Sequence, residues 1–216
     1  MKKLKLFCLT LVALTIQQAS TIASTITWGT AQNNSSDSDV VTTGTLFASA
    51  GASVTVNGVV FGDEGNRLSF DLQYTFGGFG AGGLSGDYAT LLCNAMHSGF
   101  DTVASVTMTD LVVGQQYLVQ VWGNDSRSFG IGRFETLDGT CLLDYNTTDT
   151  VGGLGQYAIG TFTADATTQI IALNANESAQ VNAIQVRSVP EPASLVLLAT
   201  GLVGLFAYAW RRRQAT

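Results

Sequence analysis

Short runs of apolar and β-branched residues, separated by glycine and polar turn formers, recur through the middle of this chain and constrain its fold most strongly. Residues 67–74 alternate apolar and polar side chains, which is typical of a strand with one buried face. Residues 116–122 are almost continuously apolar and are expected to form a central strand. The pattern predicts about ten short strands in an all-β fold, an antiparallel β-sandwich or jelly roll.

Two dipeptides indicate β-hairpins among these runs. Asn57-Gly58 and Asp138-Gly139 both suit the positive φ angles of a two-residue turn. The runs that flank these two turns are residues 53–56, 59–61, 133–137 and 140–143. The other expected strands are residues 25–28, 45–49, 103–108, 156–162, 169–173 and 179–186.

One helical spacing interrupts the β pattern, after a loop at residues 77–86 that holds six glycines. Apolar residues then recur at the intervals of one helix face, at Tyr88, Leu91, Leu92, Ala95 and Met96. Asp87 is expected to cap the N-terminus of this helix. The sequence therefore predicts one short helix within the β domain.

The N-terminus has the pattern of a secretory signal peptide. Three lysines precede an apolar run at residues 6–16, which is too short to cross a bilayer. Small residues at Thr21 and Ala23 suit cleavage after Ala23. We therefore expect residues 1–23 to be removed, leaving a domain at residues 24–188, and the alternative is an uncleaved membrane anchor.

The last 28 residues, 189–216, have the pattern of a single membrane span. Residues Ala193–Trp210 carry no charge, and 18 helical residues extend about 27 Å, close to the thickness of the hydrocarbon core. The arginines that follow favour a cytoplasmic C-terminus, which places the body across the membrane. A buried core helix is the alternative, but it would pack three arginines against a core.

The same segment resembles the PEP-CTERM sorting signal of Gram-negative bacteria. The resemblance rests on a proline motif, an apolar span and a basic end in that order, with the motif residues Pro190, Glu191, Pro192, Arg211, Arg212 and Arg213. It implies that an exosortase, a membrane-embedded cysteine transpeptidase, cuts the chain near the prolines. It also implies export through the inner membrane, transient anchoring, and a final place at the cell surface or in an exopolysaccharide matrix.

The charge of the body limits its partners. Residues 24–188 hold four arginines, no lysine and fifteen acidic residues, a formal charge of −11. Such a surface excludes nucleic acid and anionic lipid as partners. It favours solubility outside the cell, and attraction of divalent cations is the second interpretation.

Two cysteines remain after the signal peptide, Cys93 and Cys141. In an oxidising compartment they could form one disulfide, if their Cα atoms lie near 5.5 Å apart. Free thiols are the alternative. No Cys-x-x-Cys pair or Cys/His cluster occurs, which argues against a zinc site.

Asp37 and Asp39 lie in an oxygen-rich loop, together with Asn33 and Asn34. Calcium takes six to eight oxygen ligands, and jelly rolls often hold a structural calcium in such a loop. The loop lacks the glycine and glutamate of an EF-hand. A structural calcium at Asp37 and Asp39 is one interpretation, and a solvated turn is the other.

The stretch from Trp122 to Arg127 is the candidate ligand site. It runs from the end of a central strand into a loop and combines an aromatic ring with hydrogen-bonding and basic groups, at Trp122, Asn124, Asp125 and Arg127. Sugar sites often use such a set. The structural alternative places Trp122 in the core, uses Asn124 and Asp125 as turn formers, and pairs Arg127 with an acid.

No catalytic set stands out. His97 is the single histidine, no Gly-x-Ser-x-Gly occurs, and Ser98 beside it is not placed to act as its nucleophile. Nothing selects a carboxylate pair for glycoside hydrolysis from Glu64, Glu135 and Glu177. The sequence therefore predicts no enzyme and no required cofactor.

The body also resembles secreted PEP-CTERM proteins of planctomycete and verrucomicrobial type, with bodies similar to galactose-binding-like jelly rolls. The resemblance rests on residues 37–45, 54–61, 111–127, 155–166 and 182–187. It implies a non-catalytic surface or matrix protein, and glycan binding, with extracellular polysaccharide as partner, is one interpretation of its role. The alternative is a secreted glycan-active hydrolase.

Overall fold

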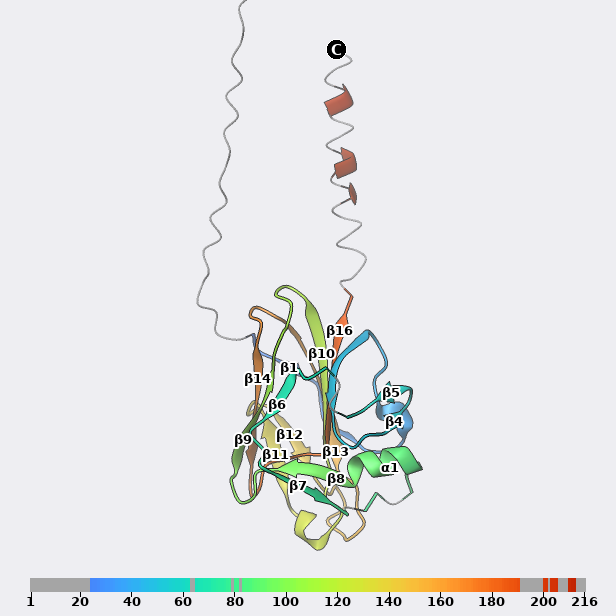
Figure 1. The fold of residues 1–216 in the computed structure, drawn as a ribbon, viewed down its shortest axis with the longest axis vertical. Coiled ribbons are helices and arrows are strands. Elements are labelled where there is room, and N and C mark those ends of the chain that lie inside the picture. The colour runs from blue at the N-terminus through green and yellow to red at the C-terminus, as the bar shows by residue number, and fades with distance from the viewer. Residues whose placement is uncertain are drawn as a thin grey trace, which may run out of the picture.

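Two antiparallel sheets lie face to face around an apolar core, with smaller sheets and an α-helix beside them (Figure 1). This computed structural model describes residues 24–62, 65–78, 80–81, 83–190, 200–201, 203–205 and 210–212. The predicted all-β class and the antiparallel sandwich are confirmed within these residues.

The larger sheet has six strands, and β10 lies at its centre as predicted. The order is β1 (Thr27–Trp28), β13 (Gln156–Thr163), β10 (Gln116–Gly123), β16 (Ala183–Val189) and β3 (Thr45–Ala50), while β2 (Gln32–Asn33) also pairs with β13. The second sheet has the order β12 (Cys141–Asp144), β11 (Phe134–Leu137), β14 (Gln169–Ala175), β9 (Val103–Met108) and β6 (Leu68–Phe70).

The inner faces of these two sheets form the main core. Val119 and Val121 of β10 meet the other sheet's Val106, Leu137 and other buried side chains in one cluster. Successive residues of a strand point to opposite faces, so Gln120 and Trp122 lie on the outer face of the larger sheet. A second cluster forms where α1 (Gly86–Leu92) and the hairpin of β4 (Thr55–Val56) and β5 (Val59–Val60) cover the outside of the larger sheet, and it holds Trp122.

Several predicted strands are divided, so the described residues contain sixteen strands, five of them only two residues long. The expected strand at 67–74 splits into β6 and β7 (Tyr74–Gly77), which belong to different sheets. The expected strand at 179–186 splits at Asn182 into β15 (Gln180–Val181) and β16. Each break lets the chain pass from one sheet to another, which periodicity alone does not reveal.

Both predicted hairpins form. Asn57 and Gly58 have φ angles of 50° and 75° and join β4 (Thr55–Val56) to β5 (Val59–Val60) in a two-residue turn. Asp138 and Gly139 have φ angles of 51° and 66°, but Leu137 pairs with Cys141. The second loop therefore has three residues instead of two.

The helix is shorter than predicted. α1 runs from Gly86 to Leu92, and its N-cap is Ser85, whose Oγ accepts from the backbone N–H of Tyr88. Asp87 lies inside the first turn, so its assignment as the cap was wrong. Ala95 and Met96 belong to β8 (Asn94–His97), which pairs with β7 and β15 in a three-stranded sheet. Two short 3₁₀ turns, η1 (Asp37–Asp39) and η2 (Ser128–Gly130), complete the elements.

The last strand reaches the sorting segment directly. β16 was expected to end at Val186 or Arg187, but it pairs up to Val189 because Gln116 on β10 and Thr45 on β3 extend the ladders beside it. Pro190 follows and lacks the N–H that a further ladder bond requires.

The terminal predictions lie mostly outside the described residues. These are the signal peptide at 1–23, the motif residues Glu191, Pro192 and Arg213, and most of the span at 193–210. In the part of the chain that is described, no helix has both the length and the apolar character to cross a bilayer. The transmembrane helix therefore stays a prediction.

Candidate functional site

Trp122 is part of the core, not of a ligand site. Its side chain is fully buried, and its indole N–H donates to the hydroxyl of Tyr88 at 3.2 Å. The ring meets Phe61 edge to face with centroids 5.6 Å apart. Of the two interpretations of this residue, the structure agrees with the structural one, since strand β10 directs Trp122 under α1 and leaves no ring face open to a sugar.

Asn124 is also structural. Its side-chain amide donates to the carbonyl oxygens of Gly80 and Leu92 and accepts from the N–H of Gly155. Its backbone N–H donates to the side chain of Asn182 at 2.7 Å. Asn124 therefore joins the end of β10 to the end of α1 and is not open to a ligand.

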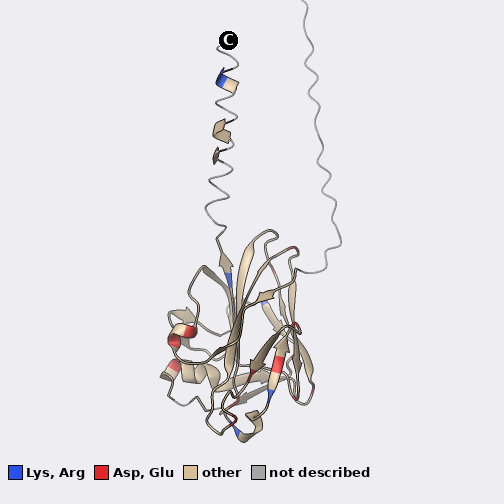
Figure 2. Cartoon of the chain, turned by 180° about the vertical axis from the view of Figure 1, so that it is seen from behind, with Lys and Arg blue, Asp and Glu red and all other residues tan. Residues whose placement is uncertain are grey.

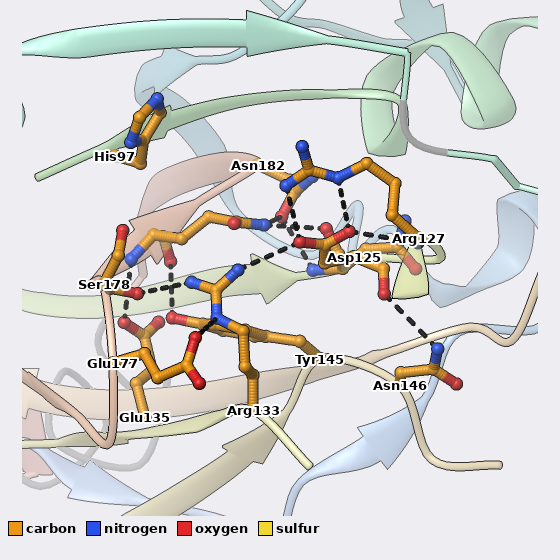
Figure 3. A network of polar contacts seen from close by, with 12 residues as sticks. His97, Asp125, Arg127, Arg133, Glu135, Tyr145, Asn146, Glu177, Ser178 and Asn182 are labelled. Carbon is orange, nitrogen blue, oxygen red and sulfur yellow. Dashed lines mark hydrogen bonds and ion pairs between the residues drawn. The ribbon is translucent and has the colours of Figure 1, made fainter. Parts of the chain in front are cut away.

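Asp125 holds two arginines in place. Its carboxylate is fully buried and accepts from Arg127 Nε at 2.9 Å and Nη2 at 2.7 Å. The same carboxylate accepts from Arg133 Nη1 at 2.9 Å (Figure 3). The expected pairing of Arg127 with an acid is thus present, and Asp125 is its partner.

Beside this ion-pair cluster lies a pocket of about 500 Å³. We call it the Arg127 pocket. Its walls come from β7, β8, η2 and the loops next to them, and its lining residues are Phe76, His97, Gly99, Phe100, Arg127, Phe129, Arg133, Glu177, Ser178 and Gln180. Of the four residues predicted to bind a ligand, Arg127 lines it.

Three phenylalanines give the pocket apolar faces. Phe100 and Phe129 are highly exposed, at 102% and 71%, and Phe76 is exposed at 42%. The guanidinium of Arg127 lies over Phe76, 4.3 Å from the ring centroid, and 5.8 Å from that of Phe129. Large exposed aromatic side chains grouped around a hollow usually indicate a binding surface.

Arg133 forms the polar floor. It is 6% exposed, and its Nη2 donates to the carbonyl of Ser178 at 2.7 Å. Its Nε has no hydrogen-bond partner among the described residues and lies 3.6 Å from a carboxylate oxygen of Glu177, whose side chain is 65% exposed. The floor thus has a buried N–H with an incomplete hydrogen bond next to a carboxylate that can move.

Glu135 lies behind Arg133 and is fully buried. Burial raises the pKa of its carboxyl group to about 7, against the opposing effects of the Gln180 N–H and the Arg133 charge. Its Oε2 accepts from the Gln180 N–H at 3.3 Å, and its Oε1 has no hydrogen-bond partner among the described residues. Glu135 is not part of the pocket lining.

His97 ends β8 and lines the pocket. Its Nδ1 accepts from the backbone N–H of Gly99, and its ring stacks on Tyr74 with centroids 5.5 Å apart. Burial lowers the pKa of its imidazole, and the charges of Arg133 and Arg127 lower it further. His97 is therefore neutral at neutral pH.

Asp37 and Asp39 lie together on η1, but they serve the fold. The Asp39 carboxylate accepts from the backbone N–H groups of Ser35 and Ser36 and from the hydroxyl of Tyr88. Asp37 accepts from the hydroxyl of Ser85. The described residues contain no group of three or more His, Cys, Asp or Glu that could hold a metal ion.

The predicted disulfide between Cys93 and Cys141 is not present. Both thiols are free. Cys93 is the C-cap of α1 and packs with the Trp122 cluster, whereas Cys141 begins β12 and belongs to the main core. The two cysteines therefore lie in different layers of the domain.

No sequence pattern selected Arg133, Glu177 or the exposed phenylalanines as binding residues. A signal was available for two of them, because Phe100 follows Gly99 and Phe129 lies between Ser128 and Gly130. Phenylalanines in such turn sequences are not carried into the core by a strand. Glu177 gave no signal, since its neighbours resemble any other turn. Glu64, the third glutamate considered, lies outside the described residues.

Comparison with known proteins identifies the tail. Residues 188–213 match the PEP-CTERM protein-sorting motif, and the match begins inside β16. No curated protein and no solved structure is significantly similar to the chain. The motif implies a protein that exosortase processes and that is sorted to the cell surface. The similarity of the body to galactose-binding-like jelly rolls stays a prediction.

Proposed function

We propose that this protein is a non-catalytic, lectin-like protein of the cell surface or exopolysaccharide matrix, which binds a glycan in the Arg127 pocket. The observation that carries the proposal is the pocket itself. Exposed rings of Phe100 and Phe129 stand beside the guanidinium groups of Arg127 and Arg133. Sugars present both C–H faces and hydroxyl groups, so such a site suits them.

The position of the pocket agrees with a surface role. β10 begins at Gln116, opposite Val189, and ends at Gly123, next to the loop that carries Arg127. Eight strand residues extend about 25 Å, so the pocket and the sorting segment lie at opposite ends of the sheet (Figure 1). While the body is attached through its tail, the pocket would therefore face away from the membrane.

The surface charge supports binding at this pocket over other places. Figure 2 shows acidic positions over several parts of the body and few basic ones. Two of the four arginines in residues 24–188, together with the single histidine, line the Arg127 pocket.

A secreted hydrolase is the second candidate, and one observation favours it. A glycosidase needs a carboxyl group with a raised pKa and a second carboxylate. Glu135 has the raised pKa, and Arg133, whose charge acts on Glu135, also lies 3.6 Å from a carboxylate oxygen of Glu177. Glu135, however, does not line the pocket and makes its hydrogen bond inside the domain. We therefore favour binding without catalysis.

A polysaccharide-binding assay on the secreted protein tests the proposal. We expect Phe129→Ala and Phe100→Ala each to weaken binding about tenfold, because each removes a stacking face. Val113→Ala is the matched control, since Val113 is an exposed apolar residue in the turn between β9 and β10, at the other end of the sheet. No binding to any polysaccharide would contradict the lectin-like role, and release of reducing sugar would favour the hydrolase.

A further inference from the structure

We propose that the Arg127 pocket selects saccharides that carry a carboxylate, such as uronic acids, and that Glu177 occupies the carboxylate position until the ligand replaces it. This inference rests on the proposed glycan binding and specifies its ligand class. It starts from the incomplete hydrogen bonding of Arg133 Nε, a buried N–H at the pocket floor.

The hydrogen bonds of Arg133 leave one direction open. Nη1 donates to Asp125 and Nη2 donates to the carbonyl of Ser178, both inside the domain. Nε faces Glu177, and the 3.6 Å separation is longer than a hydrogen bond (Figure 3). An oxygen that came closer would complete the bonding of a group that is 6% exposed, and burial makes that completion favourable.

Glu177 has the features of a replaceable occupant. Its side chain is 65% exposed, and Arg133 Nε is its partner in the one ion pair that the described residues give it. A carboxylate already fits this position without forming a full bond, so a ligand carboxylate of the same shape can take its place. The exposed glutamate would then turn into solvent at low cost.

The local charge also favours an anionic ligand once Glu177 has moved. Asp125 is the carboxylate shared by Arg127 and Arg133, so these three residues together carry one net positive charge. Glu135 adds little negative charge below about pH 7, because burial keeps it protonated. Burial is the main cause of the lowered pKa of His97, and the charges of Arg133 and Arg127 lower it further.

The test compares one oligosaccharide in two charge states. Calorimetry measures how tightly the secreted protein binds an oligogalacturonate and how tightly it binds the fully methyl-esterified form of the same oligosaccharide. We expect the acid form to bind at least fivefold more tightly than the ester. Glu177→Gln should increase affinity for the acid form by a further factor of about five and leave affinity for the ester unchanged, because the variant removes the internal competitor.

Asp110→Asn is the matched control. Asp110 is an exposed acid in the β9–β10 turn with a φ of 59°, which asparagine tolerates, and its substitution removes the same charge far from the pocket. We expect it to leave both affinities unchanged. If Asp110→Asn raised the acid affinity as much as Glu177→Gln, overall charge would explain the gain and the inference would be overturned.

The outcomes separate this inference from the proposed function. Equal binding of the acid and the ester, or binding of neutral polysaccharides alone, would overturn the carboxylate preference and leave glycan binding in place. An unchanged or lower acid affinity in Glu177→Gln would overturn the role of Glu177. Absence of binding to every polysaccharide would overturn both proposals together.

Discussion

Two buried arginines, Arg187 on β16 and Arg133 next to β11, meet their hydrogen-bonding needs in different ways. Arg187 and Arg133 are each 6% exposed. Arg187 donates to the carbonyl oxygens of Thr42, Thr43 and Gly44 and to the side chain of Gln185. It forms no ion pair with any residue that the structure describes. Arg133 instead relies on carboxylates and keeps an N–H without a full partner.

The difference separates a structural end from the end for which we propose ligand binding. Arg187 lies beside the bulge between Val186 and Arg187, and each of its side-chain nitrogens donates to a neutral oxygen. These hydrogen bonds hold the 42–44 loop against the last strand. At the Arg127 pocket, the charge of Arg133 is balanced by the carboxylates of Asp125 and Glu177, and Glu177 is exposed. Buried polar groups that are fully satisfied stabilise a fold, whereas a partly satisfied group next to a pocket indicates recognition.

The largest expected effect is at Asp125. Asp125→Asn keeps the shape of the side chain but leaves Arg133 buried without its closest counter-charge, since Asp125 contacts it at 2.9 Å. We expect the free energy of unfolding to fall by about 3–5 kcal/mol, measured by chemical denaturation, together with weaker glycan binding.

Arg127→Met is the matched control for this prediction. Arg127 uses the same carboxylate, but its side chain is 31% exposed, so its removal should cost about 1 kcal/mol. Equal losses for the two variants would show that the buried charge of Arg133 does not depend on Asp125.

The second effect is a pH dependence confined to the pocket end. In the unfolded chain Glu135 loses its proton near its ordinary pKa of 4.5, whereas in the folded state it holds the proton up to about pH 7. The folded state therefore binds more protons between these values, and its stability falls as the pH rises from about 4.5 to about 7. Glu135→Gln cannot ionise, so we expect it to exceed the native protein in stability by up to about 3 kcal/mol above pH 7.

Chemical denaturation at pH 4 and at pH 8 checks whether the stability falls as the pH rises. The stability difference between Glu135→Gln and the native protein should be small at pH 4 and large at pH 8. A difference that stayed constant with pH would contradict the raised pKa of Glu135. Arg187→Met should leave the slope between these two pH values unchanged, because no carboxylate pairs with Arg187 among the described residues.

The sequence predicted the strands better than it predicted their breaks. The β10 strand followed from an almost continuous apolar run, and both hairpins followed from residues that tolerate positive φ. Asn182 was not expected to divide a strand, since its role depends on side-chain bonds to Leu92 and Asn94, which are distant in sequence. For Trp122 the sequence left a core position and a sugar-binding position open, because local sequence does not reveal that α1 covers the outer face of β10.

The candidate site was predictable in part. Arg127 and its pairing with an acid were expected from the loop sequence, but Arg133 and Glu177 come from the ends of other strands. Contacts between residues so far apart along the chain depend on sheet order, and no local pattern in the sequence encodes it.

A smaller effect than those at Asp125 and Glu135 is expected at Arg187, where hydrogen bonds are lost without an uncompensated charge. Arg187→Met keeps an apolar stem and removes the bonds to three backbone carbonyls, while water can reach the exposed parts of the 42–44 loop. We expect a loss of about 2 kcal/mol in denaturation and no change in glycan affinity. Asp125→Asn should reduce both the free energy of unfolding and the glycan affinity. The two variants therefore separate a structural role from a role in ligand binding. A loss of binding in Arg187→Met would mean that the two ends are coupled through β16 and that the comparison between them does not hold.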